Sequence, residues 1–386
     1  CDNDEARSAQ LSRIVSGLDP GYSSDSRVLE NICKGRNLAR TFAGVEHARK
    51  VFEIAMIALS ESAFLFQQAA LLEMQHPKGS LDRADELAET ARDLDQNSHI
   101  YVHTLAEVSR RKANVASSRA RAEQLRAQSR RLLNEITIND PRKSLSFCNL
   151  LIDEVIYLLR ALPDDPKEHM IIEFDRKLAE AKDRLDKARR DFPGEAEFPS
   201  AEGRLWQHLG DEVRAKRVLQ QATVLKAQNS GVFLRLARVQ GSGGEIENSI
   251  ETLRAGLQRF PSDKQLHLEL ALRLVELNRS TSPEIEGHFG ASYGVGDHAL
   301  DARFFHACYL FWAGKIEECR NLFDEVSTRS SSDYRKRPDP KEGVIDKFIS
   351  EQTGTVASVR DDYFFIQSGC YPKQIFAHMS ALQGID

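Results

Sequence analysis

Four flat side chains stand at alternating positions in "YFFIQSGCYPKQIFAHMSAL", the stretch over 363–382. Alternate residues of a strand share a face, and if the two strands pair as a hairpin the four rings form one platform. Such a platform stacks single-stranded nucleic-acid bases, at roughly 1–3 kcal/mol per base. The alternative is that the aromatic residues only cover the end of the preceding helices. The expected nucleic-acid-binding residues are Tyr363, Phe365, Phe376 and His378, with Lys373 as the main nearby positive charge.

A second group with possible chemistry is His99, His103 and Glu107, which lie four residues apart and hence on one helical face. Zinc accepts imidazole and carboxylate ligands, so this face could supply half a metal site. A catalytic zinc helix normally reads H-E-x-x-H, and the glutamate beside the first histidine is absent. We therefore expect no metal, and we interpret the two histidines as facing a neighbouring helix pair.

The glycine-rich segment "GHFGASYGVGDHA" (287–299) is a candidate for a phosphate-binding loop. A phosphate loop follows a buried strand and carries a lysine before Ser or Thr, whereas a helix precedes this segment and no lysine is near. We interpret it as a connection between helices. The sequence also lacks a P-loop, a kinase signature, a G-x-S-x-G elbow and a Rossmann fingerprint. We expect no catalytic activity and no cofactor.

The stretch "RRKANVASSRARAEQLRAQSRR" (110–131) holds eight basic residues and a single acid, Glu123. It could follow a nucleic-acid backbone, because each neutralised phosphate releases counterions and adds affinity. The favoured interpretation is a solvated helix face that pairs with acidic neighbours such as the segment 85–95.

Composition narrows the class of protein further. A net charge of −5 over 386 residues argues against wholesale coating of nucleic acid. The six cysteines form no C-x-x-C pair, which indicates buried free thiols in a reducing compartment, the cytoplasm. The most apolar run, 51–72, is interrupted by two glutamates and two glutamines, so we expect no membrane span. The sequence opens at Cys1 without a methionine, and we expect it to be a fragment of a longer polypeptide.

Outside the strand segments, the elements that position these residues are predicted to be helices. Apolar residues recur at three- and four-residue spacing through most of 27–326, and prolines are confined to a few junctions. One junction, "QHPKGS" (75–80), is followed by acidic residues, which predicts a helix that starts with Ser80 as its N-cap.

Several of these helices repeat a pattern. Trp206, Leu209 and Gly210 follow the spacing W-x2-L-G, with Ala215 and Ala222 at later small positions. Counting 34 residues from Gly210 reaches Gly244, and another 34 reaches Asn278. A further copy of the pattern contains Gly314 between two helices and Cys319 at the small position. An earlier copy covers 64–97, with Ala84, Ala88, Ala91 and Leu94 at the matching positions.

These copies resemble degenerate tetratricopeptide repeats. The resemblance implies a right-handed superhelix, an α-solenoid, whose concave groove binds a protein or peptide. Between 99 and 190 the helices look longer and the spacing is lost, which indicates a helical hairpin or spacer. We expect a mainly α protein, with a lead-in over 1–26, repeat helices over 27–190 and 191–330, and a β module over 341–386.

The β module resembles the cold-shock domain. "IFAHMSAL" is close to that family's V-F-V-H-F-S-A-L, "YFFI" stands where it has F-G-F-I, and "GTVASV" (354–359) looks like its first strand. The resemblance implies an OB-type barrel with the four aromatic positions as base-stacking residues. The family's K-G is here Asp361-Asp362, Met379 replaces an aromatic residue, and only three strands precede Asp386.

The order of parts, helical repeats and then a cold-shock-like module, resembles the C-terminal arm of bacterial STAND-class NTPases and related anti-phage defence proteins. That resemblance implies a non-catalytic sensing arm of a larger multidomain protein, which binds a protein, a peptide or another ligand. Single-stranded RNA or DNA is a further possible partner, at the β module. The alternative is a free-standing tetratricopeptide adaptor whose C-terminal strands cap the solenoid. The sequence leaves the partner and the oligomeric state open.

Overall fold

The computed structural model describes residues 45–76, 79–225, 229–278, 281–294, 300–330, 355–359, 363–367 and 375–378. These residues are mainly helical, as the sequence predicts. The chain divides into two compact units, residues 1–273 with 291–299, and residues 274–290 with 300–386. The predicted lead-in over 1–26 lies outside the described residues.

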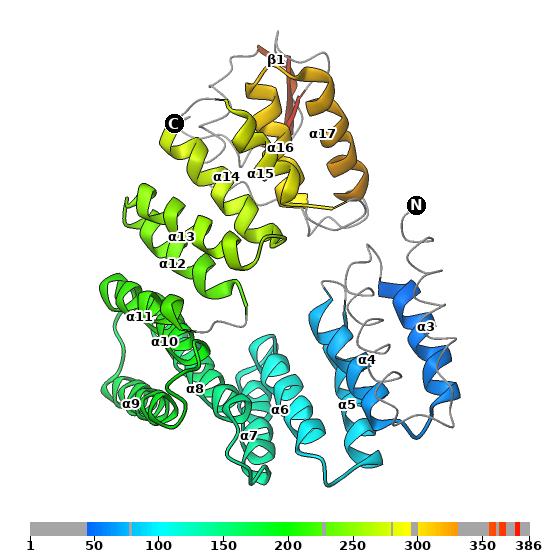
Figure 1. Cartoon of the computed structure of the whole chain (residues 1–386), viewed down its shortest axis with the longest axis vertical. Coiled ribbons are helices and arrows are strands. Elements are labelled where there is room, and N and C mark those ends of the chain that lie inside the picture. The colour runs from blue at the N-terminus through cyan, green and yellow to red at the C-terminus, as the bar shows by residue number, and fades with distance from the viewer. Residues whose placement is uncertain are drawn as a thin grey trace. The chain divides into compact units, whose positions relative to one another are not determined.

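Helices of the first unit follow one another in pairs (Figure 1). Contacts join α4 to α5, α6 to α7, α8 to α9, α10 to α11, and α12 to α13. The first helices of successive pairs also contact one another, α4 with α6, α6 with α8, α8 with α10, and α10 with α12. We call α4, α6, α8, α10 and α12 the A layer. The helices are α3 (Val45–Ala58), α4 (Ala63–Gln75), α5 (Leu81–Leu94), α6 (His99–Asn114), α7 (Arg119–Glu135), α8 (Pro141–Ala161), α9 (Glu168–Asp191), α10 (Glu197–His208), α11 (Glu212–Val224), α12 (Gly231–Ser242), α13 (Ile246–Arg259) and the start of α14 (Lys264–Asn278).

The glycines picked out by the repeat spacing close the turns inside helix pairs. Gly210, Gly244 and Gly314 have φ values of 75°, 78° and 77°, a left-handed conformation that residues with a Cβ rarely adopt. In each turn the next residue donates its N–H to a carbonyl five residues earlier, which satisfies an orphan acceptor at the helix end. These bonds are Asp211 N to Trp206 O at 3.0 Å, Glu245 N to Gln240 O at 2.8 Å, and Lys315 N to Leu310 O at 2.9 Å.

Small residues allow the paired helices to approach closely. Ala84, Ala88 and Ala91 of α5 are fully buried, as the repeat pattern predicts, whereas Leu94 is 40% exposed. Ala215 and Ala222 of α11 are fully buried too. Gly203 of α10 faces α11 so tightly that a Cβ there would lie 2.5 Å from Leu219 Cγ. The helix crossings therefore depend on the absence of side-chain volume.

Helix starts are encoded locally. Ser80 accepts a hydrogen bond from the N–H of Arg83 at 3.3 Å, which confirms the predicted N-cap of α5. Pro141 opens α8 and Pro199 lies in the first turn of α10, where a missing N–H costs nothing. Pro193 lies in the short turn before α10, which starts at Glu197.

The longer helices predicted between 99 and 190 are present. Helices α8 and α9 contain 21 and 24 residues, and they continue the pairing of the neighbouring helices. Their shared core contains Cys148, Leu151, Ile152, Leu185 and Phe198, the last from α10.

The second unit holds the end of α14, α15 (Pro283–Ala291), α16 (Leu300–Trp312) and α17 (Ile316–Ser330). The glycine-rich segment expected to be a connection is thus helical up to Ala291, where Phe289 is buried and stacks on His306 with ring centroids 5.7 Å apart. Cys319 is buried at its small position in α17. Within the described residues, no helix combines the length and apolarity that a bilayer crossing requires.

Three antiparallel strands follow in the order β1-β2-β3: β1 (Thr355–Val359), β2 (Tyr363–Gln367) and β3 (Ile375–His378). They coincide with the three segments that the sequence marks as strands. The connections between them and the residues after His378, including Met379, lie outside the described residues.

Candidate functional site

The backbone register brings the predicted base-stacking positions together. Tyr363 pairs with His378, and Phe365 pairs with Phe376. Directly paired residues of an antiparallel ladder belong to one face, so the register assigns all four positions to the same face of the β2–β3 hairpin. Their role in stacking stays a prediction, and Lys373 lies outside the described residues.

The first strand is open to solvent. All five residues of β1 are exposed, with Val356 at 56% and Val359 at 59%. Its pairing with β2 is interrupted by an irregularity between Val356 and Ser358. An OB barrel contains five strands, and the described part of the module contains three, so the cold-shock-like barrel also stays a prediction.

A polar network crosses the A layer, and sequence reasoning missed it. Arg110 of α6 bonds Glu107 on its own helix at 2.9 Å and also bonds Asp153 of α8. Asp153 accepts a second guanidinium, Arg204 of α10, at 3.1 Å, and the amide of Asn114 at 2.8 Å. Two carboxylates and two guanidinium groups thus tie three successive A-layer helices together.

Burial disfavours the charged forms of these groups, and their mutual charges oppose it. Burial alone would raise the pKa of Glu107, but the charge and hydrogen bonds of Arg110 outweigh it and hold that pKa below its usual value. Burial lowers the pKa of the Arg204 guanidinium, and the charge of Asp153 opposes that shift. The Asp153 side chain is only 6% exposed, so removing one guanidinium would leave a poorly solvated carboxylate.

Several positive charges lie close to Arg235, beyond Arg204 in the A layer. Burial lowers the pKa of Arg235 on α12, and the charges of Arg204 and Arg238 lower it further. The Nε of Arg235 is buried without a hydrogen-bond acceptor among the described residues. Burial likewise lowers the pKa of His208, with Arg160, Arg204 and Arg235 adding to the shift. This part of the layer can attract an acidic group.

The histidine–glutamate face of α6 is occupied by protein contacts. His103 Nε2 lies 2.9 Å from Ser146 Oγ on α8, so His103 faces the next helix pair, as interpreted from the sequence. His99 is exposed instead, and Glu107 is bound by Arg110. Among the described residues, no group of three or more His, Cys, Asp or Glu side chains could hold a metal ion.

The basic stretch over 110–131 is divided between the end of α6 and α7, so it is not the single helix face interpreted from the sequence, but the expected pairing with acidic neighbours is present. Lys112 bonds Asp82 at 2.9 Å and Asp85 at 2.6 Å, both on the acidic helix α5. Arg130 bonds Glu154 at 2.9 Å and also Glu180 at 2.7 Å. These partners leave few cations of the stretch for a nucleic-acid backbone.

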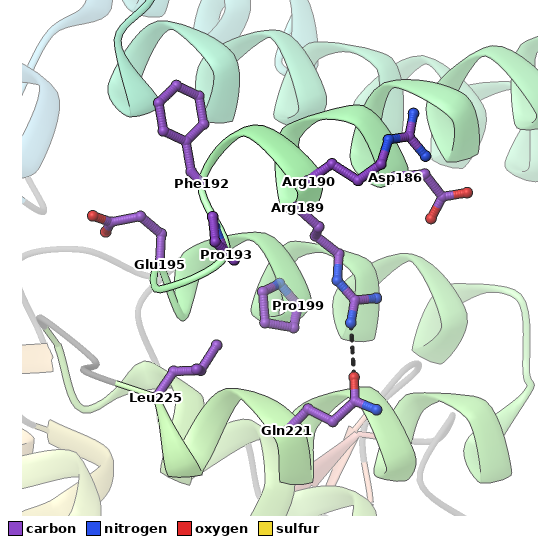
Figure 2. Close-up of a pocket in the computed structure, with 9 residues that line it drawn as sticks. All are labelled: Asp186, Arg189, Arg190, Phe192, Pro193, Glu195, Pro199, Gln221 and Leu225. Atoms are coloured by element: carbon purple, nitrogen blue, oxygen red, sulfur yellow. Dashed lines mark hydrogen bonds between the residues drawn. The ribbon is translucent and has the colours of Figure 1, made fainter.

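A hollow of about 360 Å³ lies where α9, α10 and α11 meet (Figure 2). Its walls include Phe192, Pro199 and Leu225. Arg189 spans it, bonding Glu202 at 2.5 Å and Gln221 at 2.8 Å. Because both partners are protein groups, Arg189 holds the three helices together, and we assign no chemistry to this hollow.

The described cysteines are buried free thiols, as the sequence predicts. Burial raises the pKa of Cys148 and of Cys308 to about 12 each. A thiol is nucleophilic only as its thiolate, so these two are unreactive at neutral pH.

Comparison with known proteins supports the fold. No protein-family model matches the sequence, and no curated protein matches it as a relative. Among solved structures, yeast Tom70 matches with a TM-score of 0.54 and 13% identity, over 87% of this chain and 62% of Tom70. The chain thus spans less than two thirds of Tom70.

Two further solved structures are similar at lower scores. The thermophilic TPR protein TTC0263 of Thermus thermophilus has a TM-score of 0.41 and 19% identity, over 54% of this chain and 99% of that protein. Human IFIT1, solved as a dimer with PPP-AAAA, has a TM-score of 0.40 and 14% identity, over 84% of this chain and 72% of IFIT1. The helical part is therefore a tetratricopeptide-like arm, since the Tom70 match agrees with the paired helices and the glycine turns.

Proposed function

We propose that the helical arm is a non-catalytic recognition scaffold that binds a protein or peptide along the A layer. The observation that carries this proposal is that each A-layer helix from α4 to α12 contacts the next one. Ion pairs among Glu107, Arg110, Asp153 and Arg204 fix these side chains along the layer. Stacked helix pairs offer extended surfaces of this kind to partners. The right-handed superhelix and its concave groove are part of the proposal.

The positive charge around Arg235 favours a partner with acidic side chains. Arg204 and Arg238 are paired with Asp153 and Glu269. Arg235 has no ion pair among the described residues, so an approaching carboxylate would supply its partner.

A peptide-display selection against the whole chain tests this proposal. We expect acidic peptides to be enriched, and Arg160→Glu, at an exposed position in the last turn of α8, to weaken their binding about tenfold or more. The matched control is Arg217→Glu, an exposed arginine on α11 outside the A layer. Selection of peptides without acidic residues, or equal effects of both variants, would contradict the proposal.

A second function is proposed for the strands: the β2–β3 hairpin belongs to a cold-shock-like module that binds single-stranded RNA or DNA. The support is the register, which pairs Tyr363 with His378 and Phe365 with Phe376. Because Asp361 and Asp362 oppose the few nearby cations, we expect weak binding with a shallow salt dependence.

Fluorescence anisotropy with a short labelled oligonucleotide tests the hairpin. Changing both Phe365 and Phe376 to alanine removes two stacking rings, so we expect binding to weaken about thirtyfold or more. The control is Val356→Ala, at an exposed position of β1. Equal binding by the wild type and the double variant would show that the aromatic residues cap the helices.

We also propose that the arm serves a larger multidomain protein, a STAND-class NTPase or related anti-phage defence sensor. The support is the order of parts, helical repeats before a cold-shock-like module. The alternative remains a free-standing adaptor. The coding sequence upstream of Cys1 discriminates them, because a nucleotide-binding or nuclease domain there favours the sensor.

A further inference from the structure

A cavity of about 250 Å³ lies at the end of the α8–α9 pair, away from the groups used above. It is lined by the connection that leads into α8, by the first turn of α8, and by the last turns of α9. Three cations line it, Lys143, Arg184 and Lys187, whereas Asp191 is the single carboxylate in the lining. The cavity therefore carries net positive charge.

None of these three cations has an ion-pair partner within the described residues. By contrast, Lys177, which lies on α9 with Arg184 and Lys187, is paired: it bonds Glu154 at 2.7 Å and Glu180 at 3.3 Å. Burial lowers the pKa of Lys143, and the positive charge of Arg184 lowers it further. Two like charges thus lie close together, and neither forms an ion pair with a described carboxylate.

Both of these cations are held in place. The Arg184 guanidinium lies 4.7 Å from the centre of the Phe147 ring, on which it is supported from one side. The Lys143 ammonium donates one hydrogen bond to the carbonyl of Ile136, which leaves two of its protons for another acceptor. A cation pair that is positioned in advance loses little entropy when an anion binds.

Arg184 also has an unused donor. Its Nε is buried and has no hydrogen-bond acceptor among the described residues. A buried donor without an acceptor destabilises a fold unless a bound group supplies the acceptor. Hydroxyl groups of Thr137 and Ser144 line the same cavity and provide two neutral donors.

These observations select the class of ligand. Donors outnumber acceptors in the lining, so the cavity suits an anion with several oxygen atoms rather than a metal ion. A guanidinium with an ammonium beside it matches a doubly charged oxyanion. The volume is below the range of roughly 300–1,000 Å³ that is usual for drug-sized ligands.

We propose that the cavity lined by Lys143, Arg184 and Lys187 binds a phosphate group, either as the free ion or on a small phosphate ester. The phosphate lies between the first turn of α8 and the last turns of α9. Its oxygens accept hydrogen bonds from the Arg184 guanidinium, from Lys143 Nζ and from the Ser144 hydroxyl. Its residues differ from those named above for partner binding on the A layer.

Isothermal titration calorimetry on the whole chain tests the site, with inorganic phosphate as the probe and ionic strength held constant with sodium chloride. We expect saturable binding by the wild type and at least tenfold weaker binding by Arg184→Gln, because hydrogen bonds to a charged group are lost. Lys187→Gln, at an exposed position, provides a second variant whose folding is not in question, and it weakens binding too. The control is Arg190→Gln, an exposed arginine of the same helix that does not line this cavity.

A parallel titration with glycerol 1-phosphate separates the two sources of the phosphate group. Tighter binding of the ester than of inorganic phosphate assigns the site to an ester, and equal or weaker binding assigns it to the free ion. No saturable heat with either probe overturns the proposal. So does an equal loss of binding in the Arg190→Gln control, since that result means unspecific attraction to positive charge.

Discussion

Replacing Gly210 by alanine tests whether the backbone turn, rather than packing, is what the repeat glycines supply. A Cβ built on Gly210 would meet nothing within 4 Å, so alanine fits the available space. The φ of 75° is the only obstacle, and a left-handed conformation costs a residue with a Cβ about 1–2 kcal/mol. We expect the free energy of unfolding to fall by that amount.

The matched control is Gly194→Ala. Gly194 also has nothing within 4 Å of its hypothetical Cβ, but its φ does not lie in the left-handed range. Alanine there should be neutral or slightly stabilising, since it restricts the unfolded chain. Gly210→Asn should fall between the two, because asparagine enters the left-handed region more readily than alanine. Gly244→Ala repeats the test at the glycine 34 residues later. The losses in the free energy of unfolding from the two alanine variants should be additive, because the sites are distant from each other.

Urea unfolding followed by circular dichroism measures these differences, with thermal unfolding as a check. For a unit of this size each 1 kcal/mol lowers the midpoint by about 2–4 °C. Equal stability of Gly210→Ala and Gly194→Ala would refute the argument, because the two variants differ only in backbone conformation. A loss well above 2 kcal/mol for Gly210→Ala would show that a side-chain clash is involved.

Two other perturbations follow from packing and charge. Gly203→Ala places a Cβ 2.5 Å from Leu219 Cγ, so we expect a loss of about 1–3 kcal/mol in urea unfolding, against no loss for Gly194→Ala. Burial lowers the pKa of His306 from 6.5 to about 4, which means that folding favours the neutral imidazole. Protonation of His306 therefore does not reduce the free energy of unfolding above pH 6.5. As the pH falls from 6.5 toward 4, that free energy decreases by about 3 kcal/mol in total. His306→Phe should remove that part of the acid sensitivity, and a variant as acid-sensitive as the wild type would contradict the reasoning.

Features encoded by neighbouring residues could be predicted from the sequence. The turn at Gly210, the cap at Ser80 and the small positions at Ala84 and Ala88 each depend on a pattern within a few residues. Helical spacing and strand alternation are likewise local, so the element types followed directly. The extent of α15 was missed because its glycines weaken the helical pattern without preventing the helix.

Contacts between distant residues could not be predicted in the same way. Asp153 accepts Arg110 and Arg204, which come from the preceding and the following helix pair. Nothing in the spacing of these residues shows which of many charged side chains will meet. The phosphate cavity has the same origin, because Lys143 and Arg184 come together only when α8 and α9 pack. The shared face of the four predicted stacking positions was easier to predict, since β2 and β3 follow one another in the chain.

The identical geometry of the repeat turns has an evolutionary consequence. Excising residues 211–244 would join Gly210 directly to Glu245, and the new junction would again be a left-handed glycine followed by an acidic residue that starts a helix. Helix α10 would then be followed by α13 in place of α11 without any change in the turn. Unequal recombination between copies can therefore shorten or lengthen such an arm by whole helix pairs. The register of the remaining helices survives the event, so arm length can vary while each turn remains intact.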